Sequence, residues 1–208
     1  MVKLAGPAMS LAASGTLAGT LTFATWKGRP YARSRVIPSN PKSGGQVGMR
    51  SMFSFLAKEW AGLSAPNKAS WEDRASAAAV STFNAYMSYN QFRARNFKAP
   101  TKQFPEVETA STATPGALTA VAGVRSIVVT QAVTAVGNAW AIAFYRSPTG
   151  TFNTAYDNLV AVIPTSGTDD VVFVDSPLDP GAYYYDSRFL SDDGDMDSET
   201  GEQTDTVV

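Results

Sequence analysis

The amino-acid sequence predicts an α+β protein of two modules: an N-terminal arm with a β-hairpin and a three-helix unit, then an antiparallel β-sandwich. Three observations predict this class. Apolar residues alternate along two short runs near the N-terminus, and between about residues 43 and 98 they recur every three or four positions. After residue 117, about seven short strand-like runs are separated by turn residues, a pattern typical of an antiparallel sandwich.

The first module begins with an arm and a hairpin. Residues 1–17 are small and apolar with Gly and Ser, which predicts an extended arm. Residues 18–26 (AGTLTFATW) alternate, the segment KGRP supplies turn residues, and YARSRVI is a second strand-like run. A lone hairpin is marginally stable, so we expect this one to pack on something else.

Three helices are predicted to follow. Ser43 and Gln46 form an S-x-x-Q capping box, which marks the start of a helix that ends near Gly62. Its apolar stripe consists of Met49, Phe53, Leu56, Trp60 and Leu63. A second helix is expected to start at Ser64 and to carry Trp71, and a third runs from about Ser81 to a point before Pro100.

The aromatic residues of these helices favour core packing over a ligand-stacking role. They fall at the three- and four-residue spacing of an apolar helix face, where buried side chains are far commoner than binding residues. The residues are Trp60, Trp71, Phe83, Tyr86 and Phe92.

A segment rich in proline and threonine separates the two modules. Residues 99–116 hold three prolines and little apolar content, which predicts an extended linker. The expected organisation is therefore an arm (1–17), a basic hairpin plus helical docking module (18–98), a linker (99–116) and an acidic sandwich (117–208).

Charge divides the chain in the same way. The net charge is −1, but residues 1–104 hold fourteen Lys or Arg against three Asp or Glu, whereas residues 105–208 hold three against fifteen. Such asymmetry indicates two modules that face different partners. The chain has no Cys and no His, which excludes disulfides, thiolate zinc sites and His-based catalysis. We therefore expect a protein that is not an enzyme and that has no cofactor.

The basic hairpin is the leading candidate site. Arg33 and Arg35 share one face of the second strand, and Lys27 and Arg29 flank the turn. Arginine forks can bind carboxylates of a protein partner, whereas the same cations beside aromatic rings can bind nucleic acid; a solvated strand face is the third alternative. We expect protein docking because the acidic second half would repel nucleic acid. The docking residues are Trp26, Lys27, Arg29, Tyr31, Arg33 and Arg35.

A run of acidic residues is the candidate for metal binding. Calcium takes six to eight oxygen ligands, and the carboxylates of Asp192, Asp193, Asp195 and Asp197 could supply several. However, Gly194 comes too early for the twelve-residue calcium loop, and acidic hairpin turns are common in sandwiches. The expectation is a solvated turn and no metal site.

Residues 114–208 resemble a fibronectin type III domain. The resemblance is carried by Pro115, the run around Trp140 and FYRS (144–147), and DSPLDPGAYYY (175–185). It implies that residues 178–181 (LDPG) form a turn leading into a strand, and that Tyr183 or Tyr184 packs at a corner of the sandwich. The tryptophan usual in an early strand is missing, because Trp140 lies one strand later.

The N-terminal half is similar to small structural proteins of tailed bacteriophages. The pattern runs from WKGRPY through PSNPKSGGQ to FNAY, and the stretch WAGLSAPNKASWEDRA has a faint likeness to a high-mobility-group box. The phage resemblance implies a virion protein, assembled in the host cytoplasm, that docks in many copies on capsid, neck or tail proteins and projects its sandwich.

Two other functions remain open. One is a nucleic-acid-binding protein that uses the hairpin and the box-like helices, and the other is a carbohydrate-binding module that contacts host-surface glycans. No membrane partner is expected, since no stretch approaches the roughly 18–20 apolar residues of a membrane span.

Overall fold

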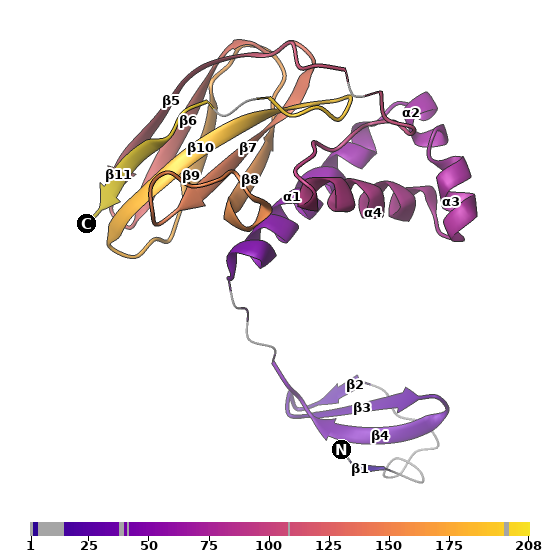
Figure 1. The fold of residues 1–208 in the computed structure, drawn as a ribbon. Helices are drawn as coiled ribbons and strands as arrows, with labels where there is room; N and C mark the ends of the chain where they lie inside the picture. The colour runs from indigo at the N-terminus through magenta and orange to yellow at the C-terminus, as the bar shows by residue number, and fades with distance from the viewer. Residues whose placement is uncertain (1, 4–14, 38–39, 41, 108, 198–199) are drawn as a thin grey trace. The chain divides into compact units, whose positions relative to one another are not determined.

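The computed structural model describes residues 2–3, 15–37, 40, 42–107, 109–197 and 200–208. Its contacts divide the chain into two compact units, Met1–Pro41 and Lys42–Val208 (Figure 1). The predicted α+β class, with an N-terminal hairpin, helices and an antiparallel β-sandwich, is confirmed.

The first unit is a small antiparallel sheet with the strand order β1-β4-β3-β2. The strands are β1 (Val2–Lys3), β2 (Gly15–Leu17), β3 (Leu21–Trp26) and β4 (Arg29–Ser34). The predicted hairpin is β3–β4, and Trp26 pairs with Arg29 across a two-residue turn. Lys27 (φ 48°) and Gly28 (φ 74°) are both left-handed, as a tight hairpin turn of type I′ requires.

The predicted arm differs from the structure where the structure describes it. Residues 4–14 lie outside the described residues, but β1 and β2 extend the hairpin on both sides, with Lys3 opposite Tyr31 and Gly15 opposite Phe23. These strands are part of the sheet because backbone pairing satisfies the polar groups that the hairpin edges would otherwise expose.

The second unit begins with α1 (Gly44–Gly62), α2 (Ala65–Ala69), α3 (Glu72–Ala78) and α4 (Thr82–Arg95). The Oγ atoms of Ser64 and Ser81 accept hydrogen bonds from the third residue after each, so they cap α2 and α4. Ser43 is the N-cap residue of α1, but its side chain makes no capping bond, so the predicted capping box does not form. None of the described helices is long and apolar enough to cross a membrane.

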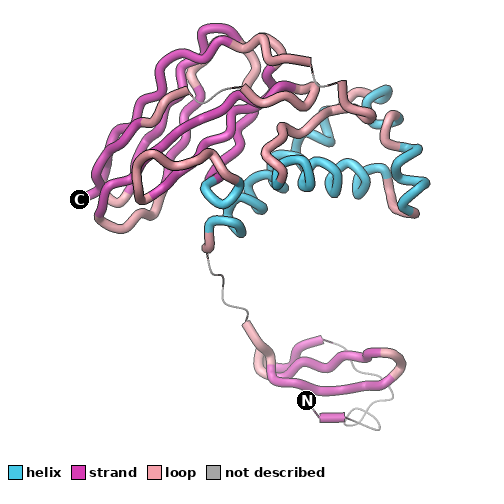
Figure 2. Tube along the Cα trace, in the orientation of Figure 1, coloured by secondary structure: helices cyan, strands magenta, loops and turns pink. Residues whose placement is uncertain are grey.

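The sandwich consists of a four-stranded sheet, β11-β10-β7-β8, and a three-stranded sheet, β5-β6-β9, within the described residues (Figure 2). Every pairing is antiparallel. The strands are β5 (Thr114–Gly123), β6 (Ser126–Ala135), β7 (Ala139–Ser147), β8 (Leu159–Pro164), β9 (Val171–Asp175), β10 (Gly181–Ser191) and β11 (Gln203–Val207). Ile127, Val129, Phe144 and Phe189 lie in the core between the sheets.

The helices cover the outer face of the four-stranded sheet. A second core joins Phe55 and Leu56 of α1 to Trp140 of β7 and Leu190 of β10, and the rings of Phe55 and Trp140 are 5.0 Å apart. Strand β7 is therefore buried on both faces, with Ile142 and Phe144 in the inter-sheet core and Trp140 beneath the helices. This arrangement differs from the predicted organisation, because the helices share a core with the sandwich and do not form a module with the hairpin.

The predicted linker also differs from the structure. Ala99 and Thr101 are fully buried, and Thr101 forms a β-bridge with Asp193. Asn90 exchanges two hydrogen bonds with the backbone of Thr101, and the Trp71 indole N–H donates to Lys102 O (3.1 Å). Composition predicts an extended segment, but side chains of the helices form hydrogen bonds with its backbone N–H and C=O groups and hold it against the body of the unit.

Candidate functional site

Strand register places the predicted docking residues on one face of the N-terminal sheet. Opposed residues of antiparallel strands point to the same side, and successive residues alternate. Trp26 pairs with Arg29 and Thr22 with Arg33, whereas Tyr31 lies opposite Ala24. Trp26, Arg29, Tyr31 and Arg33 therefore share a face, which we call the basic face.

Arg35 and Lys27 extend this face at its two ends. The Arg35 N–H donates to Thr20 O (2.6 Å), so the pairing continues one residue beyond β4 and Arg35 alternates onto the side of Arg33. Lys27 occupies the turn, and its Nζ lies 4.8 Å from the centre of the Trp26 ring, within cation–π range. All six predicted residues are therefore gathered on or beside the basic face.

The side chains of the basic face are accessible. Trp26 is 65% exposed, and Lys27, Arg29, Arg33 and Arg35 are also exposed. Residues 1–41 contain five Lys or Arg and no Asp or Glu, so the sequence of this unit offers no carboxylate to neutralise them. An exposed tryptophan among uncompensated cations is suited to binding an anionic surface.

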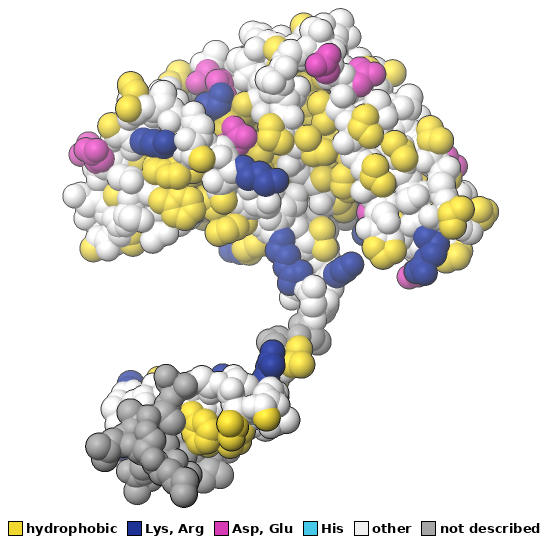
Figure 3. Space-filling view, turned by 180° about the vertical axis from the view of Figure 1, so that it is seen from behind, with side chains coloured by type: hydrophobic (Ala, Val, Ile, Leu, Met, Phe, Trp, Pro, Cys, Tyr) yellow, Lys and Arg dark blue, Asp and Glu magenta, His cyan; other side chains and the backbone are white. Residues whose placement is uncertain are grey.

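The opposite face of the same sheet is apolar. Leu21, Phe23 and Ala32 alternate onto it, and Ala32 is buried. Figure 3 shows hydrophobic side chains gathered on the visible side of this sheet, with Lys and Arg side chains at its margin. The sheet is thus two-sided, with its cations and its aliphatic residues on different faces.

The helix aromatics are mostly core residues, as predicted. Trp71 and Tyr86 are fully buried with their rings 5.3 Å apart, and Trp60 packs against Phe83 and Tyr86. Burial raises the pKa of the Tyr86 phenol, and the nearby Glu59 raises it further.

Two aromatics depart from the core prediction. Phe92 of α4 is 64% exposed. Phe53 of α1 is 50% exposed, because the buried stripe of that helix runs through Met52, Phe55 and Leu56 instead. Helical spacing identified an apolar face, but the packing of α1 on the sheet turned a neighbouring stripe inward.

The acidic turn makes structural contacts. Asp192 forms an ion pair with Lys102 (3.2 Å), and Asp195 accepts a hydrogen bond from the Ser111 N–H (2.9 Å). Across the part of the chain that the structure describes, no group of three or more acidic side chains is placed to hold a metal ion. The calcium candidates Asp193 and Asp197 belong to the same turn and are not gathered with the others into such a group.

The predicted sandwich corner forms at Tyr183. Its Oη donates to Asp179 O (3.1 Å), which ties the strand to the turn four residues upstream, as a tyrosine corner does. Nearby, Asp175 pairs with Arg146 (2.8 Å) and accepts a hydrogen bond from Tyr185 Oη (2.9 Å). Burial raises the pKa of Tyr185, and the Asp175 carboxylate adds to the shift.

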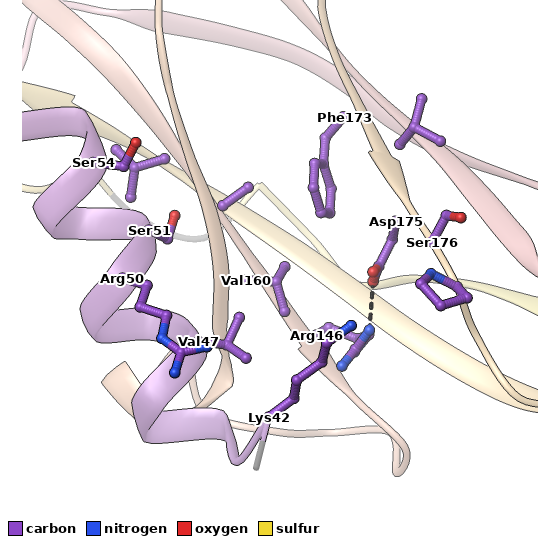
Figure 4. A pocket seen from close by; sticks show the side chains of 14 residues that line it. Lys42, Val47, Arg50, Ser51, Ser54, Arg146, Val160, Phe173, Asp175 and Ser176 are labelled. Atoms are coloured by element: carbon purple, nitrogen blue, oxygen red, sulfur yellow. Dashed lines mark hydrogen bonds and ion pairs between the residues drawn. The ribbon is translucent and has the colours of Figure 1, made fainter. Parts of the chain in front are cut away.

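A groove near this cluster was not foreseen from the sequence. It has a volume of about 490 Å³ and lies between α1, β8 and β9 (Figure 4). Val160 and Phe173 line it, and cations from α1 and β7 stand at its rim. The segment VVFVD (171–175) is one of the strand-like runs after residue 117, but its sequence does not indicate that the strand borders a groove.

The model of a family of unknown function, DUF6266, matches residues 13–175. No curated protein matches the chain.

Two solved structures are similar to parts of the chain. One is the PKD domain of an M14-like peptidase from a Thermoplasmatales archaeon, with 17% identity, a TM-score of 0.32, and 47% of this chain and 98% of that chain covered. The other is OgpA from Akkermansia muciniphila, with 14% identity, a TM-score of 0.31, and 49% of this chain and 29% of that chain covered.

Proposed function

The chain belongs to the DUF6266 family, and we propose that it is a non-enzymatic structural protein that docks through the basic face onto an acidic protein surface. The observation that carries the proposal is the register that brings Trp26, Arg29, Tyr31 and Arg33 onto one face, on which Tyr31 is half-buried and the other three are exposed. Arginine forks bind carboxylates bidentately, and tryptophan, tyrosine and arginine are the residues that dominate protein interfaces.

Charge favours a protein partner over nucleic acid. Outside residues 1–41 the chain holds twelve Lys or Arg and eighteen Asp or Glu, so the body tethered to the basic face carries about −6. This charge repels a polyanion, whereas a protein can present a local acidic patch. The helices that resemble a high-mobility-group box are also poorly placed to bind nucleic acid. Trp71 is buried, and α1 packs on the sandwich.

The non-enzymatic part of the proposal rests on how the buried polar groups are used. Glu106 pairs with the buried Arg93 (3.0 Å) and accepts a hydrogen bond from Tyr89. Asp175 is engaged by Arg146 and Tyr185. These carboxylates are committed to structural contacts, which supports a role in assembly.

The proposed setting is the virion of a tailed phage, where the chain decorates the capsid, neck or tail in many copies and projects its sandwich. This setting is supported by the resemblance of the N-terminal half to phage structural proteins. Display in many copies would let a small basic face give firm attachment through multivalency.

The test uses the tagged full-length chain in its source organism after particle induction. We expect the wild-type chain to co-purify with particles on a density gradient, and Arg33→Glu with Arg35→Glu to reduce the amount bound at least about tenfold, because two attractive contacts become repulsive. Lys58→Glu with Arg95→Glu, a matched pair of exposed sites on the helices, should incorporate normally.

Two results would remove the proposal. One is a double variant of the basic face that is incorporated at normal copy number. The other is a wild-type chain absent from particles that shifts DNA on a gel with a steep salt dependence, since that behaviour identifies phosphate binding.

A further inference from the structure

The two sheets of the sandwich both end at the groove shown in Figure 4. Strand β8 is the last strand of the four-stranded sheet, and β9 is the last strand of the three-stranded sheet. Among the described residues β9 pairs with β6 alone, so the backbone groups along its other edge have no strand partner. An edge of this kind is a template for a further strand.

The edge of β9 lacks the features that usually block strand addition. Proteins protect edge strands with lysine, proline or a bulge, but β9 reads VVFVD and its pairing with β6 has an unbroken register. Val172 and Val174 are more than half exposed. The strand is thus regular, rich in β-branched residues and open on one side.

The groove has room for one extended chain. Its volume of about 490 Å³ is within the range of ligand sites. Residues of α1, among them Val47, Ser51 and Ser54, form the wall opposite β9. Because this wall faces the edge, a single peptide strand fits the space better than the sheet of a second copy does.

The charges at the rim indicate the sequence of the bound chain. Lys42, Arg50 and Arg146 all line the groove, and Asp175 is the carboxylate among the lining residues. Asp175 pairs with Arg146, whereas Lys42 and Arg50 make no ion pair with any residue in the described part of the chain. The floor between these cations is apolar, with Val160 and Phe173.

We propose that this groove binds an extended peptide segment with alternating apolar and acidic residues, which adds as a strand to the edge of β9. The apolar side chains would lie on Val160 and Phe173, and the carboxylates would reach Lys42 and Arg50. The site is separate from the basic face, so it gives the protein a second interaction of a different kind.

The test measures binding of a capped, fluorescent hexapeptide of alternating valine and glutamate to the full-length chain. We expect saturable binding that shifts the backbone amide signals of Val171–Asp175. Two peptide controls should bind at least about fivefold more weakly: one with lysine in place of glutamate, and one with N-methyl groups that remove its hydrogen-bond donors.

Protein variants locate the site. Arg50→Glu should weaken binding at least about fivefold, whereas Lys58→Glu, the same charge change at another exposed position of α1, should change it less than about twofold. Ser54→Trp should block the groove, and its thermal melting would confirm that it folds.

Two kinds of result overturn the inference: no binding of the glutamate peptide, or equal binding of the lysine or N-methyl peptide. Equal binding of the peptide by Arg50→Glu and by the wild type would also overturn it. Arg33→Glu with Arg35→Glu should bind the peptide normally, so failure of the docking proposal and failure of this one are distinguishable.

Discussion

Arg93 is the residue that joins three parts of the second unit. Its side chain is 3% exposed, and its guanidinium contacts Glu106 (3.0 Å), Ala99 O (2.7 Å) and Gly194 O (2.7 Å). The helix α4, the segment after it and the acidic turn are therefore held by one planar group. A buried charge of this kind is stable only while its hydrogen bonds are made.

Arg93→Met should lower the free energy of unfolding by about 3 kcal/mol or more, because it removes the cation paired with Glu106 and leaves two backbone carbonyls without their donor. Urea unfolding of the full chain measures the change. Arg95→Met, two residues away and exposed, should stay within about 0.5 kcal/mol. Equal effects of the two variants would show that the hydrogen bonds and ion pair of Arg93 do not stabilise the protein.

At the scale of elements, α1 packs unusually close to the segment before β8. Gly48 is buried, and a Cβ atom there would lie 2.5 Å from Tyr156 O in the short helix η1 (Tyr156–Asn158). A Cβ atom at Gly44 would lie 2.0 Å from Asp157 O. Glycine at these positions lets the helix backbone touch the η1 backbone, which sets how α1 lies on the sheet.

Gly48→Ala should destabilise the protein by about 1–3 kcal/mol, although alanine is the better helix former, because the methyl group meets backbone atoms that cannot move aside. Gly62→Ala, at the open end of the same helix, meets nothing within 4 Å and should be neutral or stabilising by up to about 1 kcal/mol. Thermal melts of both variants measure whether each substitution raises or lowers the melting temperature. A stabilised Gly48→Ala would contradict the close approach of α1 to η1.

The extents of α1 and α4 were predictable from sequence because they depend on local signals. Ser81 caps α4 through its own side chain, and the apolar spacing sets the length of α1. The break between α2 and α3 was not predictable. Ser70 Oγ accepts a hydrogen bond from the Phe104 N–H, and the indole of Trp71 is bound to Lys102 O, so distant residues hold the chain at that point.

At the scale of the whole molecule, the sandwich depends on the helices. Trp140, Tyr145, Leu159 and Leu190 belong to the core that α1 completes. Without the helices these side chains would face water on the outer surface of the four-stranded sheet.

A fragment of residues 109–208 should therefore lack a cooperative thermal transition, whereas Lys42–Val208 should melt cooperatively. Exposure of each large apolar side chain costs about 2 kcal/mol, so four of them approach the whole stability of a small domain. Circular dichroism and dye binding to exposed apolar surface measure the difference. A shorter fragment that melts near the temperature of the longer one would show that the sandwich is an independent domain.

Local periodicity and turn chemistry in the sequence predict the α+β class, the hairpin, the positions of the sandwich strands along the chain and the shared face of Arg33 and Arg35. Three features do not follow from local patterns: where the chain divides, which stripe of α1 is buried, and how residues 99–107 are held. Those features depend on contacts between residues far apart in the sequence, such as Phe55 with Trp140 and Arg93 with Gly194. No local pattern records such pairings, and the groove beside β9 exists only because they form.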